Sequence, residues 1–158
     1  MQQQYVSLKL AQSLDGKIAT TSGDSKWISS PTSRKHAHKL RKEYDAVLVG
    51  AETVIKDNPS LTVRLVKGRH PKRIIIDGRL RIPLNANVVT DALKRQTIVA
   101  TASHSNPKKI RLLRSRGIKV LEFPAKKFEI NFRAVLKKLA AEENIASVLV
   151  EGGSKIHG

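Results

Sequence analysis

The sequence has no cysteine, and this excludes disulfides, a thiol nucleophile and cysteine-ligated zinc within its 158 residues. It also has no apolar run as long as a membrane span needs, and the N-terminal segment MQQQYVSLKL has no signal-peptide pattern. Hydrophobic residues make up 40% of the chain, which is typical of a globular domain with its own core. We therefore expect one domain over residues 1–158 and a cytoplasmic location.

Acidic and aromatic residues are scarce. Thirteen Asp and Glu face 30 Lys and Arg, which gives a net charge of +17, and a charge of this sign favours nucleic acid as a partner. However, no run of basic residues exceeds two, and aromatic residues, which would stack on bases, are only 4%. We expect much of the charge to be solvated surface and a smaller part to attract phosphorylated ligands. A basic nucleic-acid-binding module is kept as an alternative.

Short apolar segments alternate with helical patterns along the chain. Residues 5–11 alternate at period two and predict a strand. Ser30-Pro31 predicts a helix start, because Ser caps free amides and Pro suits the first helical position. Further strands are predicted at 46–49, 73–77, 97–101, 118–121 and 147–150, with helices from Asn106-Pro107 to Gly117 and near 131–143. This alternation predicts an α/β domain with a mostly parallel sheet flanked by helices.

Three predicted strands end in polar or glycine residues. These ends are Gly50-Ala51-Glu52-Thr53, Asp77-Gly78-Arg79 and Glu151-Gly152-Gly153-Ser154. Ligands of parallel sheets usually bind beyond the carboxyl ends of strands, so the pattern predicts a site there. Taken alone, the last turn is as typical of a plain strand-to-helix connection as of a pyrophosphate cradle, because it lacks the complete phosphate-binding fingerprints.

Single side chains in other segments allow two interpretations each. Arg41 and Arg64 are candidates for a two-pronged phosphate clamp, although a pair chosen from so many arginines is more often surface. Trp27, in a Gly/Ser-rich loop, either stacks on a flat ligand or anchors the loop. Thr53 and Asp57 supply a hydroxyl and a carboxylate, or belong to a capped loop. The five histidines look superficial or helical and lack metal-ligand spacing, so we assign them no catalytic role and assign no residue to a metal.

Six segments, taken in order, resemble the reductase domain of bacterial bifunctional riboflavin-biosynthesis deaminase/reductases, within the dihydrofolate-reductase-like superfamily. They are residues 11–19, 25–30, 40–41, 46–54, 57–64 and 150–153. The resemblance runs through the whole chain and implies a dihydrofolate-reductase-like fold, NADPH as the hydride donor and a homodimer. It further implies reduction of 5-amino-6-(5-phosphoribosylamino)uracil at the ribose C1′, which gives the 5-phosphoribitylamino product.

The resemblance also implies roles for individual residues. Its cofactor contacts fall on Ala11, Trp27, Thr53, Asp57, Gly78 and the loop Gly153, Ser154, Lys155, Ile156, His157 and Gly158. Its substrate contacts fall on Ser25, Arg41, Leu61, Arg64 and Glu151. Asp57 and Glu151 are the candidate catalytic residues, since a proton must reach the opening ring oxygen, and water is a further candidate. The charge of Arg79 favours the 2′-phosphate of NADPH.

The sequence departs from the family pattern in two ways. The family domain continues past Gly158 with a helix and further strands, so we expect a missing C-terminal segment. The family's zinc deaminase domain needs cysteines, so we expect no deamination by these residues. A reductase of the non-deaminated 2,5-diamino-6-ribosylamino-4(3H)-pyrimidinone 5′-phosphate is an alternative, although Ser25-Lys26-Trp27-Ile28 favours the bacterial type. A dihydrofolate-type reductase is another, but a pterin without phosphate would not need both arginines.

Overall fold

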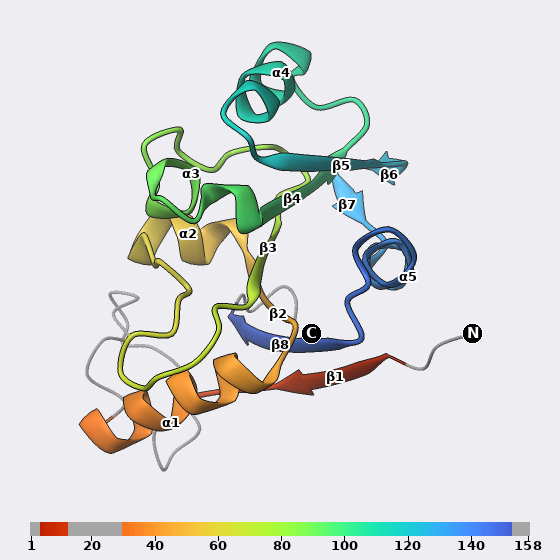
Figure 1. Cartoon of the computed structure of the whole chain (residues 1–158). Coiled ribbons are helices and arrows are strands. Elements are labelled where there is room, and N and C mark those ends of the chain that lie inside the picture. Colours follow the sequence, from red (N-terminus) through yellow and green to blue (C-terminus); the bar gives the residue numbers. More distant parts are fainter. Residues whose placement is uncertain (1–3, 13–29, 153–158) are drawn as a thin grey trace.

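A six-stranded sheet forms the centre of the domain (Figure 1). The computed structural model describes residues 4–12 and 30–152. The strand order is β1-β8-β2-β3-β4-β5, and every neighbouring pair is parallel. The strands are β1 (Tyr5–Leu8), β2 (Ala46–Gly50), β3 (Lys72–Ile76), β4 (Thr97–Ala102), β5 (Lys119–Phe123) and β8 (Ser147–Gly152). The predicted parallel α/β architecture is therefore confirmed.

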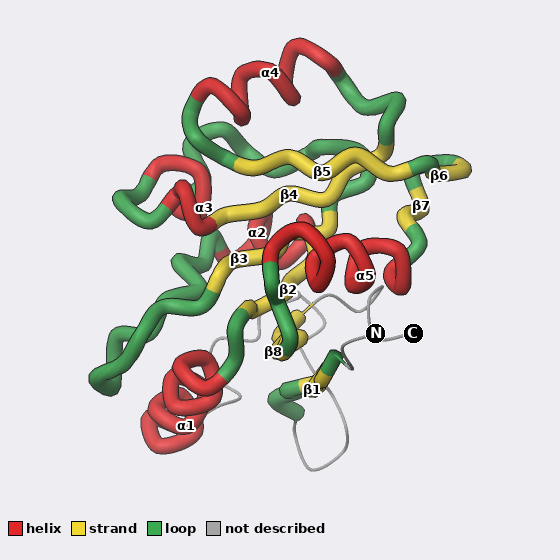
Figure 2. Tube along the Cα trace, turned by 45° about the vertical axis from the view of Figure 1, so that its right-hand side comes forward, coloured by secondary structure: helices red, strands yellow, loops and turns green. Residues whose placement is uncertain are grey.

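Helices cover both faces of this sheet (Figure 2). They are α1 (Pro31–Glu43), α2 (Ala51–Asp57), α3 (Asn87–Thr90), α4 (Pro107–Ser115) and α5 (Phe132–Glu143), with a short 3-10 helix at Lys94–Gln96. Successive strand residues point to opposite faces, so Val47 and Val49 pack with α2, α3 and α4, while Ala46 and Leu48 pack with α5. The inner strands β2 and β4 are buried along their whole length because both of their faces are covered, whereas the edge strand β1 is largely exposed. Among the described residues, no helix has the length and apolarity to cross a membrane.

The predicted helix starts are confirmed by their capping contacts. Ser30 Oγ accepts a hydrogen bond from the Ser33 backbone N–H at 3.1 Å, and α1 begins at Pro31. The Asn106 side chain likewise accepts from the first amides of α4, and Gly117 follows that helix with a φ of 86°. The first strand is shorter than predicted. Its pairing ends at Leu8, opposite Val150, one residue before the register of β8 becomes irregular.

Two small elements have no signal in the sequence. The hairpin of β6 (Ala125–Lys126) and β7 (Glu129–Ile130) turns at Lys127 and Phe128, which both have positive φ. Such turns usually contain Asn or Gly, so Lys-Phe does not predict one. The four-residue helix α3 begins without a side-chain cap, and its residue Val88 is fully buried in the core.

Candidate functional site

The three strand ends predicted to form a site are neighbours in the structure. Because the strands are parallel and β2 lies between β8 and β3, the carboxyl ends of all three meet at one edge of the sheet (Figure 1). Glu151 and Gly152 end β8, β2 runs directly into α2, and Gly78 follows β3. This edge brings together residues that are far apart in the sequence.

A bulge at the end of β8 directs Glu151 out of the regular strand pattern. Leu48 pairs with Val150 and Val49 with Gly152, so Glu151 has no partner residue in β2. Its carboxylate instead accepts two hydrogen bonds from Arg41 of α1, at 2.7 Å from Nε and 2.6 Å from Nη2. Only 7% of the Glu151 side chain and 13% of the Arg41 side chain is exposed. This is a bidentate, largely desolvated ion pair, a geometry that fixes both groups.

The two arginines of the predicted phosphate clamp both reach Thr62. Arg41 Nη1 donates to the Thr62 carbonyl oxygen at 3.0 Å, and Arg64 Nη1 lies 3.4 Å from Thr62 Oγ1. The structure therefore brings three of the predicted substrate residues, Arg41, Arg64 and Glu151, into one connected group. A guanidinium has N–H groups beyond those that Arg41 uses here, so its ion pair with Glu151 is compatible with binding an anion.

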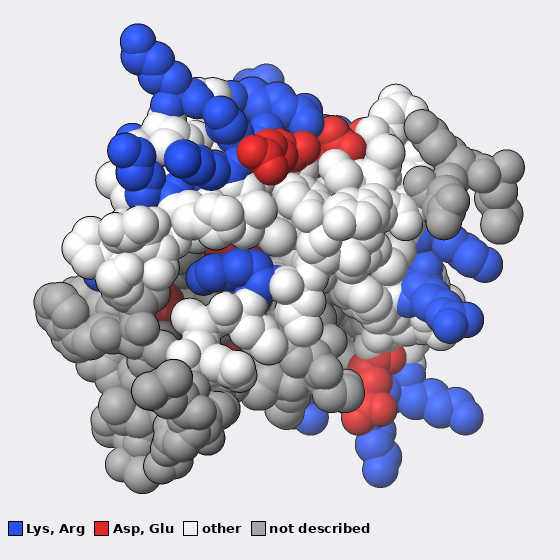
Figure 3. All heavy atoms as spheres, turned by 90° about the horizontal axis from the view of Figure 1, so that it is seen from below, with Lys and Arg blue, Asp and Glu red and all other residues white. Residues whose placement is uncertain are grey.

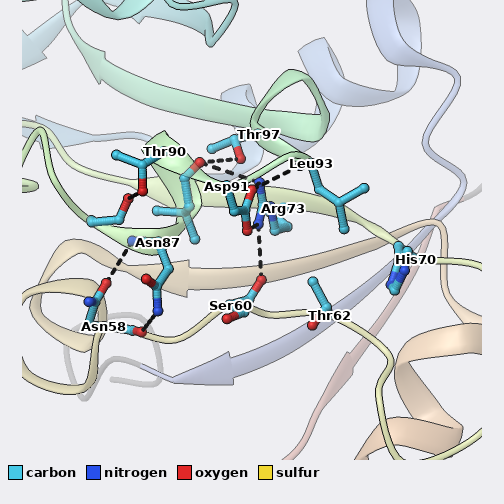
Figure 4. Close-up of polar contacts among 12 residues, drawn as sticks. Asn58, Ser60, Thr62, His70, Arg73, Asn87, Thr90, Asp91, Leu93 and Thr97 are labelled. Atoms are coloured by element: carbon cyan, nitrogen blue, oxygen red, sulfur yellow. Dashed lines mark hydrogen bonds and ion pairs between the residues drawn. The ribbon is translucent and has the colours of Figure 1, made fainter.

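The loop that carries Thr62 and Arg64 has an unusual backbone held by side chains (Figure 4). Asn58 and Leu61 have φ values of 41° and 53°, in a region that non-glycine residues rarely adopt. Asn87 donates two hydrogen bonds to Asn58, from its backbone N–H to Oδ1 at 2.8 Å and from its side-chain amide to the carbonyl oxygen at 2.7 Å. The Ser60 carbonyl accepts one of 3.1 Å from Arg73. Leu61, a predicted substrate contact, places its side chain in the core that packs with α2.

Arg73 anchors this loop from inside the domain and was given no role by sequence analysis. It lies in β3 with 1% of its side chain exposed, and it donates to both carboxylate oxygens of Asp91 at 2.6 and 2.9 Å. An arginine inside the run Arg73-Ile74-Ile75-Ile76 is itself a signal, because a buried charge requires a partner. The sequence does not show which acidic residue supplies it.

Two histidines hold consecutive backbone amides of the same loop. His38 Nδ1 accepts from the Arg64 N–H at 2.9 Å, and His70 Nδ1 accepts from the Val63 N–H at 3.1 Å. His38 is helical, as predicted, but it is buried and not superficial, because α1 turns it toward the loop. The sequence does contain a signal for this placement, because His38 lies three residues before Arg41 and so on the same helix face.

Burial and charge act together on His38. Burial lowers the pKa of His38, and the nearby cations Arg41 and Arg64 lower it further. Glu151 and a hydrogen bond with the Thr62 backbone oppose the shift, but the net pKa lies below the ordinary value for histidine. The imidazole is therefore neutral at neutral pH, as its role as a hydrogen-bond acceptor requires.

The predicted cofactor residue Thr53 lies in close contact with Gly152, at the end of β8. A Cβ at Gly152 would lie 2.9 Å from Thr53 Oγ1, closer than real Cβ contacts, so a larger residue here would displace the Thr53 hydroxyl. Ala11 lines an open groove of about 810 Å³ between α1 and the end of β1. Asp57 is the exposed last residue of α2.

The packing of the β6–β7 hairpin explains why residue 78 is a glycine. A Cβ there would clash with the carbonyl group of Phe128 at the tip of the β6–β7 hairpin. Arg79, the residue proposed to recognise a 2′-phosphate, is exposed beside this tip, with its guanidinium carbon 5.2 Å from the centre of the Phe128 ring. The remaining predicted residues lie outside the described part of the chain: Ser25, Trp27, Gly153, Ser154, Lys155, Ile156, His157 and Gly158.

Basic side chains form separate groups on the face that Figure 3 shows, with uncharged surface between them.

The chain is a parallel α/β domain whose carboxyl edge joins an arginine–carboxylate pair to a glycine-lined strand end. Ligands of such sheets usually bind beyond the carboxyl ends of the strands, and an arginine in that place suits an anionic group. The RibD C-terminal domain family matches residues 4–158, and the chain belongs to this family of riboflavin-biosynthesis reductase domains.

Individual relatives agree with this assignment. The riboflavin biosynthesis protein RibD of Bacillus amyloliquefaciens is 48% identical over 155 residues, which are 98% of this chain and 41% of that protein. A RibD structure from Acinetobacter baumannii superposes with a TM-score of 0.81 at 29% identity, over 98% of this chain and 41% of that one. A Thermotoga maritima structure, described as a diaminohydroxyphosphoribosylaminopyrimidine deaminase/5-amino-6-(5-phosphoribosylamino)uracil reductase, has a TM-score of 0.75 at 39% identity, over 98% and 40%. The chain thus spans about two fifths of these relatives.

Proposed function

We propose that this domain reduces 5-amino-6-(5-phosphoribosylamino)uracil with NADPH, converting the ribosylamino group into a 5-phosphoribitylamino chain. The observation that carries the proposal is the connected group of Arg41, Glu151 and Arg64 at the carboxyl edge. It joins a carboxylate, which accepts hydrogen bonds from hydroxyl and amino groups, to a second arginine that is exposed beside it. A phosphorylated sugar linked to an aminopyrimidine has both kinds of group.

In this proposal the arginines bind the phosphate and Glu151 orients the sugar or the pyrimidine. Both Glu151 oxygens already accept a bond from Arg41, and each has further acceptor capacity. That arrangement supports a role for Glu151 as an orienting acceptor, which leaves Asp57 or water to deliver the proton to the opening ring oxygen. Hydride transfer depends mainly on alignment, so positioning by these residues accounts for most of the catalysis.

The fit of NADPH rests on the contact between Gly152 and Thr53. Here the backbone of β8 at Gly152 approaches the hydroxyl of Thr53 in α2, and a residue larger than glycine would fill the space between them. Ala11, Thr53, Asp57, the backbone near Gly78 and residues 153–158 would hold the cofactor. When bound, NADPH supplies the hydride. Arg79 would favour it over NADH by pairing with the additional phosphate.

We propose the deaminated uracil, and not the diamino compound, as the substrate because the similar proteins support it. The RibD protein of Bacillus amyloliquefaciens is 48% identical to this chain over 155 aligned residues, and the Thermotoga maritima protein is described as a reductase of this uracil. The family match also favours a reductase over a nucleic-acid-binding module. A dihydrofolate-type reductase remains the second candidate within the fold, and it gives no reason for the paired arginines.

The test is to measure NADPH oxidation by the full-length protein with three substrates: the uracil compound, its diamino precursor and dihydrofolate. Turnover of the uracil compound is expected. Turnover of dihydrofolate, with no turnover of the uracil compound, would refute the proposal. Arg64→Ala should raise the KM for the phosphorylated substrate about 10- to 100-fold, because it removes a charged hydrogen-bond donor. The Kd for NADPH should change less than about twofold, and equal losses would contradict the clamp. Arg69→Ala, at an exposed arginine paired with Asp45, is the matched control.

A further inference from the structure

We propose that His38 is a positioning residue for substrate phosphate: by holding the backbone N–H of Arg64 it directs that arginine, and protonation of His38 releases it. This inference rests on the function proposed above and assigns to that site a residue and a pH response of its own. It concerns the orientation of Arg64 and gives His38 no contact with substrate.

The contacts show one helix holding both ends of a short loop segment. His38 and Arg41 lie three residues apart on α1 and face the segment Thr62–Arg64. Arg41 donates to the carbonyl of Thr62 at 3.0 Å, and His38 accepts from the N–H of Arg64 at 2.9 Å. These two bonds hold the backbone at both ends of the segment, and the position of the Arg64 backbone fixes the direction of its Cα–Cβ bond. The helix therefore sets the direction in which the Arg64 side chain leaves the backbone.

The hydrogen bond exists in one protonation state. An imidazole that accepts at Nδ1 has its proton on Nε2, whereas the protonated ring has an N–H on both nitrogens. The Nδ1–H of a protonated His38 would face the N–H of Arg64, so two donors would oppose each other. Arg41 from the same helix and Arg64 from the loop face the ring as cations, while Glu151 from β8 and the Thr62 backbone act in the opposite sense. The segment is thus held at neutral pH and released in acid.

His70 provides a matched comparison within the same segment. It makes the same kind of bond, from the Val63 N–H to Nδ1 at 3.1 Å, but it is exposed. Water can replace an exposed acceptor, whereas loss of the buried His38 acceptor leaves an amide without one. The two histidines should therefore differ in effect although their bonds are alike.

The experiment compares His38→Leu, His38→Asn and His70→Leu in the full-length protein. In His38→Leu the Arg64 amide should exchange its hydrogen about tenfold faster by NMR, and the KM for the phosphorylated substrate should rise about tenfold. Its kcat and the Kd for NADPH should stay within about twofold, because the contact orients a substrate-binding residue. In His38→Asn the side-chain oxygen takes the place of Nδ1, so the KM should stay near the wild-type value. In His70→Leu both quantities should change less than about twofold.

The pH response has its own readout. Below the ordinary titration range of histidine, the ratio of the wild-type KM to the His38→Asn KM should rise, because asparagine does not titrate. The substrate phosphate titrates equally in both measurements and cancels in the ratio. If His38→Leu does not fold, this ratio still decides, and a constant ratio would overturn the inference.

Other outcomes separate the inference from the proposed function. Faster exchange of the Arg64 amide in His38→Leu with an unchanged KM would refute the positioning role and leave the function intact. Unchanged exchange would refute the contact itself. Absence of turnover by the wild-type protein would refute the proposed function, and with it the role of His38 in substrate binding.

Discussion

Replacing Arg73 by methionine should destabilise the domain strongly, since methionine fills the space but offers no donor. The change leaves the Asp91 carboxylate without its bidentate partner and removes the donor to the Ser60 carbonyl. Removal of one partner from a buried ion pair costs about 3–5 kcal/mol. Because 29% of the Asp91 side chain is exposed and can be hydrated, we expect the lower end, about 3 kcal/mol. For a domain of this size, that lowers Tm by roughly 6–12 °C.

Urea unfolding and thermal melting measure this difference, and Arg69→Met is the matched control. Arg69 also pairs with one carboxylate, Asp45, but 60% of its side chain is exposed, so its loss should cost about 0.5 kcal/mol. The double variant R73M/D91N should recover part of the loss, since it removes the unpaired charge. A cost below about 1 kcal/mol for R73M, or equal costs at the two arginines, would refute the anchoring role of Arg73.

Two further changes test the strand end and the far end of the sheet. Gly152→Ala should raise the Kd for NADPH about tenfold in a fluorescence titration, because the new Cβ would lie 2.9 Å from Oγ1 of Thr53, a proposed cofactor contact, and would displace it; an unchanged Kd would contradict an NADPH contact at this strand end. Burial raises the pKa of Asp45, but hydrogen bonds from Arg69 and Ser147 outweigh it, so the net pKa lies below its ordinary value of 3.8. Asp45 therefore stabilises the fold at neutral pH, and this contribution is lost as pH falls through the lowered pKa. Between about pH 5 and about pH 3 the free energy of unfolding should fall more for wild type than for D45N, and parallel curves would contradict this.

Local chemistry explains which parts of the fold were predictable. Ser30 and Pro31 mark the start of α1 because capping depends on neighbours within one turn, and the apolar runs mark strands because both sheet faces are buried. The end of β1 was predicted three residues too late, because its pairing depends on a bulge in β8, far away in the chain. The turn at Lys127-Phe128 has no local signal at all.

The site was predictable as a set of residues, but not as a set of contacts. The arginines at 41 and 64 were singled out from their chemistry, and the resemblance added Glu151. The bond between Arg41 and Glu151 joins positions 110 residues apart and depends on the β8 bulge, which no pattern in the sequence reveals. The roles of His38 and Arg73 were missed for the same reason, because their partners lie in loops placed by the tertiary fold.

The proposed function requires that hydride passes from NADPH to the ribose C1′ of a phosphorylated ribosylaminopyrimidine. The most direct test incubates the full-length protein with the uracil substrate and NADPH deuterated at the transferable position of the nicotinamide. Mass spectrometry of the product should show one deuterium at C1′ of a ribitylamino chain. NADPH oxidation without deuterium in the product, or no oxidation with this substrate, would contradict the claim.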